Sequence, residues 1–201
     1  FWGHRRHFLL FSRPLVLVRI SNCYMALGQE ERGLRLLEDA SKSAPDDLEI
    51  AEAIYTYLLK KGELDRAQEG FSQILARHED AYYSLYKLGI IALQKDHDAD
   101  AVELFTRSLI YRPDFVVSYV ARGVAYYEMG DHVKAREQFE EARKRDGENG
   151  GLAYFNIGVM YFNENIPEKA EAVFTELAKT MPGFADPHYH LSYLFFTRNN
   201  L

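Results

Sequence analysis

Residues 82–113 place apolar side chains at steps of three and four positions in both halves of the segment. This spacing gathers the apolar side chains on one face of a helix, so the segment predicts two successive amphipathic helices. Asp96 falls between the two halves, where the first helix must end. Aspartate tolerates the left-handed backbone conformation that closes a helix, which favours a tight turn at this point. The pattern therefore predicts a helix–turn–helix unit.

The same unit recurs along the chain with a period of about 34 residues. A Gly, Asn or Asp stands at each turn, a small residue follows it, and a large apolar residue comes next. These are Gly28, Gly62, Asp96, Gly130 and Asn165; then Gly33, Ala67, Ala101, Ala135 and Ala170; then Leu37, Phe71, Phe105, Phe139 and Phe174. A fixed period of this length is typical of a repeat solenoid. We expect the four phenylalanines to be buried between helices.

This pattern resembles the tetratricopeptide repeat, a helix–turn–helix family. The family's small residue, which lies where the two helices of a repeat touch, is matched by Ser21, Gly89, Gly123, Gly158 and Ser192. Tyr55 departs from it, so we expect looser or locally adjusted packing in the second repeat. The resemblance implies an all-α fold, a right-handed superhelical solenoid of five repeats and a partial sixth.

The family's motif also sets the domain boundaries. It implies an N-terminal basic and aromatic arm at 1–13 and a tetratricopeptide domain at 14–201. The expected repeats are 14–47, 48–81, 82–115, 116–149 and 151–184, followed by a partial repeat at 185–201.

Charge is unevenly distributed along the chain. The net charge is −6, but residues 1–13 hold +3, which leaves −9 for the rest. An acidic body repels phosphate backbones, so we expect no nucleic-acid partner. The arm suits either an anionic membrane surface or a cap over the first repeat, and membrane contact is expected only through it. Cys23 is the single cysteine; we expect it to be a small packing residue.

In tetratricopeptide folds the first helix of each repeat lines a concave groove. The resemblance therefore implies a partner-binding surface at the second, fifth, ninth and twelfth positions of the repeats. From the third repeat onward these positions are unusually apolar, whereas Glu49 and Glu52 occupy them in the second. The candidate contact residues are Tyr83, Tyr86, Ile90, Leu93, Val117, Val120, Val124, Tyr127, Leu152, Phe155, Val159, Phe162, Tyr189, Tyr193 and Phe196.

These observations favour a scaffold or adaptor that binds a peptide or amphipathic helix of another protein in an aromatic groove. Two alternatives stay open. One is a structural subunit whose groove or C-terminal edge is buried in an oligomer or larger complex, and the other is a membrane-associated assembly factor. A role in binding chaperone tail carboxylates is disfavoured, because Val18, Ala53 and Tyr83 stand where cationic or polar clamp residues belong.

No motif for catalysis, phosphate binding or metal binding is found in the sequence. His188 and His190 are two positions apart on an expected helix, so they point in different directions. We therefore expect neither an enzyme nor a cofactor or metal. A lone cysteine fits a reducing cytoplasm, and a periplasmic or membrane-peripheral protein would show the same composition.

Overall fold

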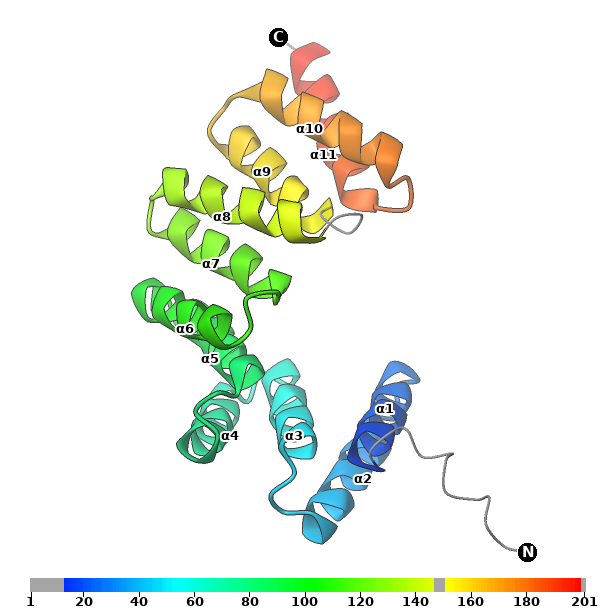
Figure 1. The fold of residues 1–201 in the computed structure, drawn as a ribbon. Helices are drawn as coiled ribbons and strands as arrows, with labels where there is room; N and C mark the ends of the chain where they lie inside the picture. The colour runs from blue at the N-terminus through cyan, green and yellow to red at the C-terminus, as the bar shows by residue number, and fades with distance from the viewer. Residues whose placement is uncertain (1–12, 147–150, 200–201) are drawn as a thin grey trace, which may run out of the picture. The chain divides into compact units, whose positions relative to one another are not determined.

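The computed structural model describes residues 13–146 and 151–199, and within these ranges the chain forms eleven α-helices and no strand (Figure 1). The helices are α1 (Arg13–Ala26), α2 (Glu30–Ser43), α3 (Leu48–Lys60), α4 (Leu64–Arg77), α5 (Tyr82–Gln94), α6 (Asp98–Tyr111), α7 (Val116–Glu128), α8 (His132–Asp146), α9 (Gly151–Asn163), α10 (Pro167–Thr180) and α11 (Ala185–Asn199). Each expected repeat contains two of them, and the partial repeat contains α11. Apart from Arg13, the predicted N-terminal arm lies outside the described residues.

The five predicted turn residues all adopt the left-handed conformation. The φ angles are 72° at Gly28, 80° at Gly62 and 77° at Gly130. Asp96 and Asn165 have φ angles of 58° and 57°. Few residue types accept this conformation at low cost, which explains why only Gly, Asp and Asn occur between the paired helices.

The repeating phenylalanines form the core, as predicted. Phe71, Phe105, Phe139 and Phe174 are buried, and the alanine that precedes each of them by four residues is buried too. The small residue at the helix crossing is required sterically. A Cβ atom on Gly123 would lie 2.6 Å from Cε1 of Phe139, so the two helix backbones approach as closely as the ring permits.

The second repeat accommodates its large residue at the helix crossing by local adjustment. The ring of Tyr55 packs edge-on against Phe71, with 5.8 Å between the ring centroids and 65° between the ring planes. Phe71 stays fully buried. The expectation of adjusted packing at Tyr55 is therefore confirmed.

The prediction that Cys23 is a packing residue is wrong, because its side chain is exposed. Ile91, Ala125 and Met160 occupy the same repeat position and are buried. Each of these three follows a complete helix pair, whereas no described helix precedes α1.

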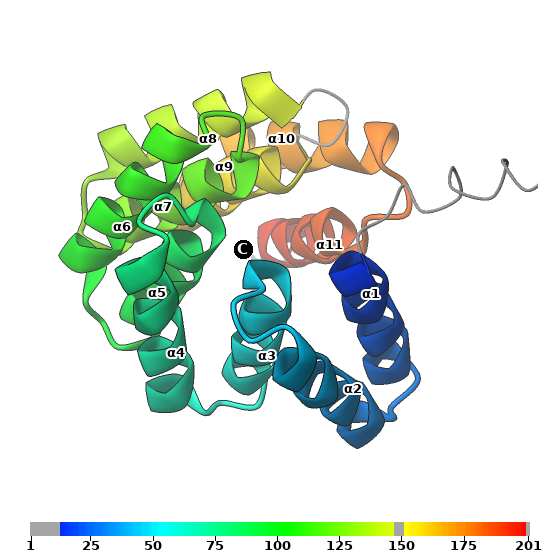
Figure 2. The same ribbon diagram turned by 60° about the horizontal axis from the view of Figure 1, so that its bottom comes forward.

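The chain divides into two compact units, Phe1–Ile91 and Ala92–Leu201, with the division inside α5. In the first unit α1 packs against α2 and α3, and α3 packs against α4. In the second unit each helix from α6 to α11 packs against the next one in the sequence. Figure 2 shows α8 and α10 along the outer edge of the second unit and α11 on its inner side.

Candidate functional site

In the second unit, the first helix of each repeat exposes large apolar side chains. These helices are α7, α9 and α11. All of these side chains occupy groove positions of the predicted surface. They are Val117, Leu152, Tyr189, Tyr193 and Phe196, with exposed fractions of 40%, 52%, 71%, 48% and 68%. Apolar side chains left in water at regular repeat positions form a surface on which another apolar face can dock.

The remaining candidates on α7 are half-buried rather than open to solvent. Val120, Val124 and Tyr127 pack against a buried cluster that contains Phe139 and Ile157. Their positions are therefore held by the core of the unit. Such residues can form the fixed floor of a binding surface, but they offer less area to a partner than the sequence alone suggests.

On α9, the predicted contact residues Phe155 and Phe162 are partly covered by α11. The ring of His190 lies 5.5 Å from the ring of Phe155 and 5.3 Å from that of Phe162, measured between centroids. Phe162 also packs against Tyr193 at 5.5 Å. The last described helix thus occupies part of the surface that the sequence assigned to a partner.

His190 is a site residue that sequence reasoning missed. It stacks on Phe174, with 4.8 Å between centroids and 20° between planes. Its Nδ1 atom is buried without a hydrogen-bond partner. Burial lowers the pKa of His190, while nearby Asp186 acts in the opposite direction. The repeat pattern carried no signal for this contact, because the earlier repeats have other residue types at the same position.

In the first unit, the predicted residues Tyr83, Tyr86 and Ile90 are half-buried. The Lys87 ammonium lies 5.0 Å from the centroid of the Tyr83 ring and 5.2 Å from that of Tyr86. Burial, and secondarily the neighbouring Tyr83, raises the pKa of Tyr86. The aromatic face of α5 therefore already holds one cation of the chain itself.

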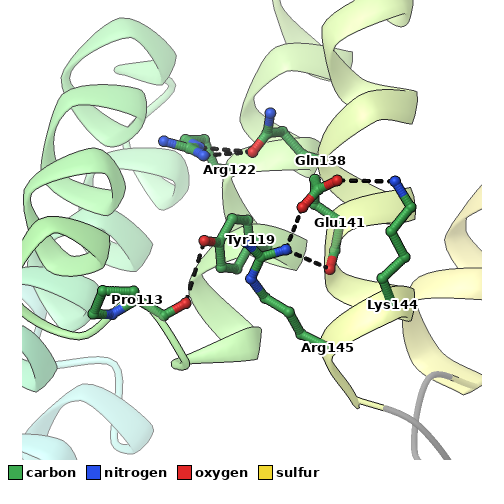
Figure 3. Close-up of polar contacts among 7 residues, drawn as sticks. All are labelled: Pro113, Tyr119, Arg122, Gln138, Glu141, Lys144 and Arg145. Atoms are coloured by element: carbon green, nitrogen blue, oxygen red, sulfur yellow. Dashed lines mark hydrogen bonds and ion pairs between the residues drawn. The ribbon is translucent and has the colours of Figure 1, made fainter.

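Other tyrosines of the second unit have a structural role. Arg122 donates to Gln138 Oε1 from both Nε and Nη2, at 3.0 and 2.6 Å, and its guanidinium lies 5.6 Å from the Tyr119 ring centroid (Figure 3). Arg145 lies 4.6 Å from the same ring centroid. Tyr119 donates its own hydroxyl to the carbonyl of Pro113 at 3.2 Å. The two arginine contacts tie α7 to α8, and the hydroxyl ties α7 to the loop that precedes it.

Tyr154, at the same position of the next repeat, also packs against an arginine. Its ring lies 3.9 Å from the Arg143 guanidinium, and its hydroxyl donates to Glu176 at 2.6 Å. Burial, together with Glu176, raises the pKa of Tyr154 to about 12. The hydroxyl therefore remains a hydrogen-bond donor throughout the physiological pH range.

The described part of the chain contains no group of three or more His, Cys, Asp or Glu side chains arranged to hold a metal ion. His188 is exposed and His190 is half-buried, so the two differ in environment. None of the helices within residues 13–146 and 151–199 has the length and apolar content that a membrane crossing needs.

Two relatives show partial similarity in sequence. Human Protein O-mannosyl-transferase TMTC3 is 24% identical over 157 residues, which cover 70% of this chain and 17% of that protein. RNA polymerase-associated protein CTR9 of Caenorhabditis elegans is 27% identical over 167 residues, 63% of this chain and 14% of that protein. The chain thus spans less than a fifth of either relative.

Among solved structures, a thermophilic TPR protein from Thermus thermophilus matches 91% of this chain and 99% of its own with a TM-score of 0.76. The two are 19% identical, so the likeness concerns the fold. The fold class is therefore the all-α tetratricopeptide solenoid, as predicted. Such folds generally mediate protein–protein interactions and are typically not enzymes. The tetratricopeptide repeat model matches residues 53–114 and 120–190, and the chain therefore belongs to the tetratricopeptide repeat family.

Proposed function

We propose that this protein is an interaction scaffold that holds a peptide or amphipathic helix of another protein on the first helices of its second unit. The observation that carries the proposal is the exposure of predicted contact residues on all three of these helices. Val117 is exposed on α7, Leu152 on α9, and Tyr189, Tyr193 and Phe196 on α11.

The chemistry of this surface suits an apolar partner. Aromatic side chains are favoured anchors in protein interfaces because they bury a large area at little cost in conformational entropy. Val120 and Val124 lie among these residues in the repeat pattern and are fixed by the core, so the surface needs little ordering on binding. A helix that presents apolar residues at three- and four-residue steps matches such a face.

The experiment is an affinity capture with substituted baits, read out by mass spectrometry. Leu152→Ala and Tyr193→Ala are each expected to weaken capture of the partner about tenfold, a typical effect for an interface anchor. Val133→Ala is the matched control. Val133 is 70% exposed but lies on α8, the second helix of its repeat, so this substitution should leave capture unchanged. Far-UV circular dichroism checks that every bait is folded. Capture that survives both surface substitutions contradicts this assignment.

We propose binding rather than catalysis as the role of the chain itself. Mannosyl transfer and association with RNA polymerase are named for proteins of which this chain matches 17% and 14%, so neither activity is proposed here. A tetratricopeptide segment would serve in a longer protein as the part that holds a partner.

A second candidate function is supported by a different observation. Phe195 on α11 is 47% exposed, whereas its counterpart Tyr161 is covered by Arg136 and Lys169. A pocket of about 440 Å³ opens beside it among α9, α10 and α11. This favours a structural subunit whose C-terminal edge is buried in an oligomer. Light scattering over a range of concentrations tests it, because a protein that stays monomeric at high concentration is not a homo-oligomeric subunit.

A further inference from the structure

A separate pocket lies in the first unit, where α1, α3 and α5 meet. Its volume is about 290 Å³. It does not involve the exposed apolar residues of the second unit on which the proposed function rests. Its walls differ in chemistry, and each wall comes from one helix.

The wall from α1 is mainly apolar, and the wall from α3 carries two acidic side chains. Leu15 and Val18 of α1 line the pocket on one side. Glu49 and Glu52 of α3 line it as well, and because they are three positions apart on a helix they lie on the same face. An aliphatic chain that ends in a cation matches this pair of walls.

Glu52 is held in place by α5, the first helix of the next repeat. Its Oε1 atom accepts a hydrogen bond from Ser84 Oγ of α5 at 2.7 Å. Burial raises the pKa of Glu52, Ser84 lowers it, and the neighbouring Glu49 carboxylate raises it again, while the Lys87 ammonium of α5 offsets only part of that repulsion by lowering it. The two carboxylates therefore repel each other, and a cation placed between them would relieve this repulsion.

The third wall is aromatic. Tyr82 and Tyr83 of α5 line the pocket, and the Tyr83 hydroxyl lies 3.4 Å from Thr56 Oγ1, which orients the ring. The Lys87 ammonium lies over the Tyr83 and Tyr86 rings, so this aromatic wall binds a cation within the protein itself.

One cation of the chain lines the pocket, but at its other end. Lys60 is eight residues beyond Glu52 on α3. At the rise of an α-helix this separates the two backbones by about 12 Å. The charge of the pocket is therefore polarised along α3, with both carboxylates near the N-terminal end of the helix and Lys60 at its last residue.

We propose that this pocket is a binding site for an arginine or lysine side chain presented by an extended segment of a partner protein. The guanidinium or ammonium group contacts Glu49 and Glu52, the tyrosines of α5 flank it, and the aliphatic stem and an adjacent apolar residue rest on Leu15 and Val18. Recognition of a basic side chain by the first unit adds specificity to the apolar contacts proposed for the second unit.

The test uses the full chain and a nine-residue peptide with one central arginine flanked by leucines and with blocked ends. A twin peptide carries citrulline, which keeps the shape of arginine and removes its charge. The arginine peptide is expected to bind at least tenfold more tightly than its twin in fluorescence anisotropy, and the preference should weaken at high salt. Glu49→Gln should remove most of this preference, whereas Glu69→Gln, at an exposed position on α4, should preserve it.

Several outcomes would overturn the proposal. Absence of binding, or equal affinity for the two peptides, removes the cation site. If the preference for the arginine peptide over the citrulline peptide survives both Glu49→Gln and Glu52→Gln, the cation binds elsewhere. Binding that tightens when residues 1–12, with Arg5 and Arg6, are removed shows that this segment is the occupant. A concentration-dependent dimer that dissociates in the Glu49→Gln variant shows that a second copy of the chain is the occupant. Because all these variants keep Leu152 and Tyr193, the outcome is independent of the capture experiment above.

Discussion

Tyr55 lies directly against Gly70: a Cβ atom on Gly70 would stand 2.2 Å from Cδ1 and Cε1 of the Tyr55 ring. In the fourth and fifth repeats the relationship is reversed, since Gly123 and Gly158 on the first helix face Phe139 and Phe174 on the second. The second repeat thus keeps the same close approach of its two helices, with the glycine on the second helix and the aromatic ring on the first.

Gly70→Ala is expected to destabilise the protein by about 1–3 kcal/mol, because the new methyl group must displace the Tyr55 ring from a packed position. The midpoint of urea unfolding measures this change. Gly183→Ala is the control, since no atom lies within 4 Å of the added Cβ there, and its effect should stay within about 0.5 kcal/mol. Combining Gly70→Ala with Tyr55→Ala should cost less than the sum of the two single changes. Strict additivity would show that the two residues do not interact.

Asp96→Gly and Asn165→Gly are expected to raise stability by up to about 1 kcal/mol each. Both residues have positive φ angles, and glycine removes the strain of this left-handed conformation. The greater conformational entropy that glycine gives the unfolded chain offsets part of this gain. Gly130→Ala should lower stability by about 1 kcal/mol, because its space is open and only the backbone resists. Thermal unfolding followed by circular dichroism compares the three variants. A stabilised Gly130→Ala protein would contradict this explanation of the turns.

Arg122 of α7 connects three helices of the second unit, since it donates to Gln138 on α8 (Figure 3). From Nη1 it also donates to Thr106 Oγ1 on α6, at 3.0 Å. Burial lowers the pKa of this guanidinium. Arg122→Met is expected to cost about 1–3 kcal/mol, because the partners lose charge-assisted hydrogen bonds in a partly buried place. Arg145→Met removes an exposed cation near the same tyrosine and should cost less than about 1 kcal/mol. Chemical denaturation ranks the two, and equal costs would refute the special role of Arg122.

The packing of α11 should weaken in mild acid through His190. Burial lowers the pKa of His190 in the folded protein, so the unfolded chain binds more protons as the pH falls below about 6.5, the usual histidine value. The contribution of neutral His190 to the free energy of unfolding is therefore fully present above that pH, and it declines as the pH falls toward the pKa of the folded state. Thermal melts between pH 5 and 7.5 should show this decline, and His190→Phe should reduce it. His188→Gln, at an exposed neighbour, should leave the pH profile unchanged; a profile altered equally by both would rule out His190 as its source.

The positions of the candidate surface could be predicted from the sequence, but the exposure of its side chains could be predicted only in part. Leu152 and Tyr193 are exposed as expected for groove residues. Phe155 and Phe162 were assigned by the same rule, yet His190 of α11 packs against both. The rule identifies which side of a helix faces away from the core of its own repeat. It does not include the helix that follows.

The sequence by itself determined the helices, their turns and the phenylalanine core. A left-handed residue such as Asp96 and an apolar step of three or four residues act through neighbours close along the chain, so they can be identified without coordinates. The tertiary structure decided the exposure of Cys23, the pairing of Tyr55 with Gly70 and the burial of the His190 Nδ1 atom. These depend on side chains that other helices bring together, and the burial of an atom is a property of everything around it in space.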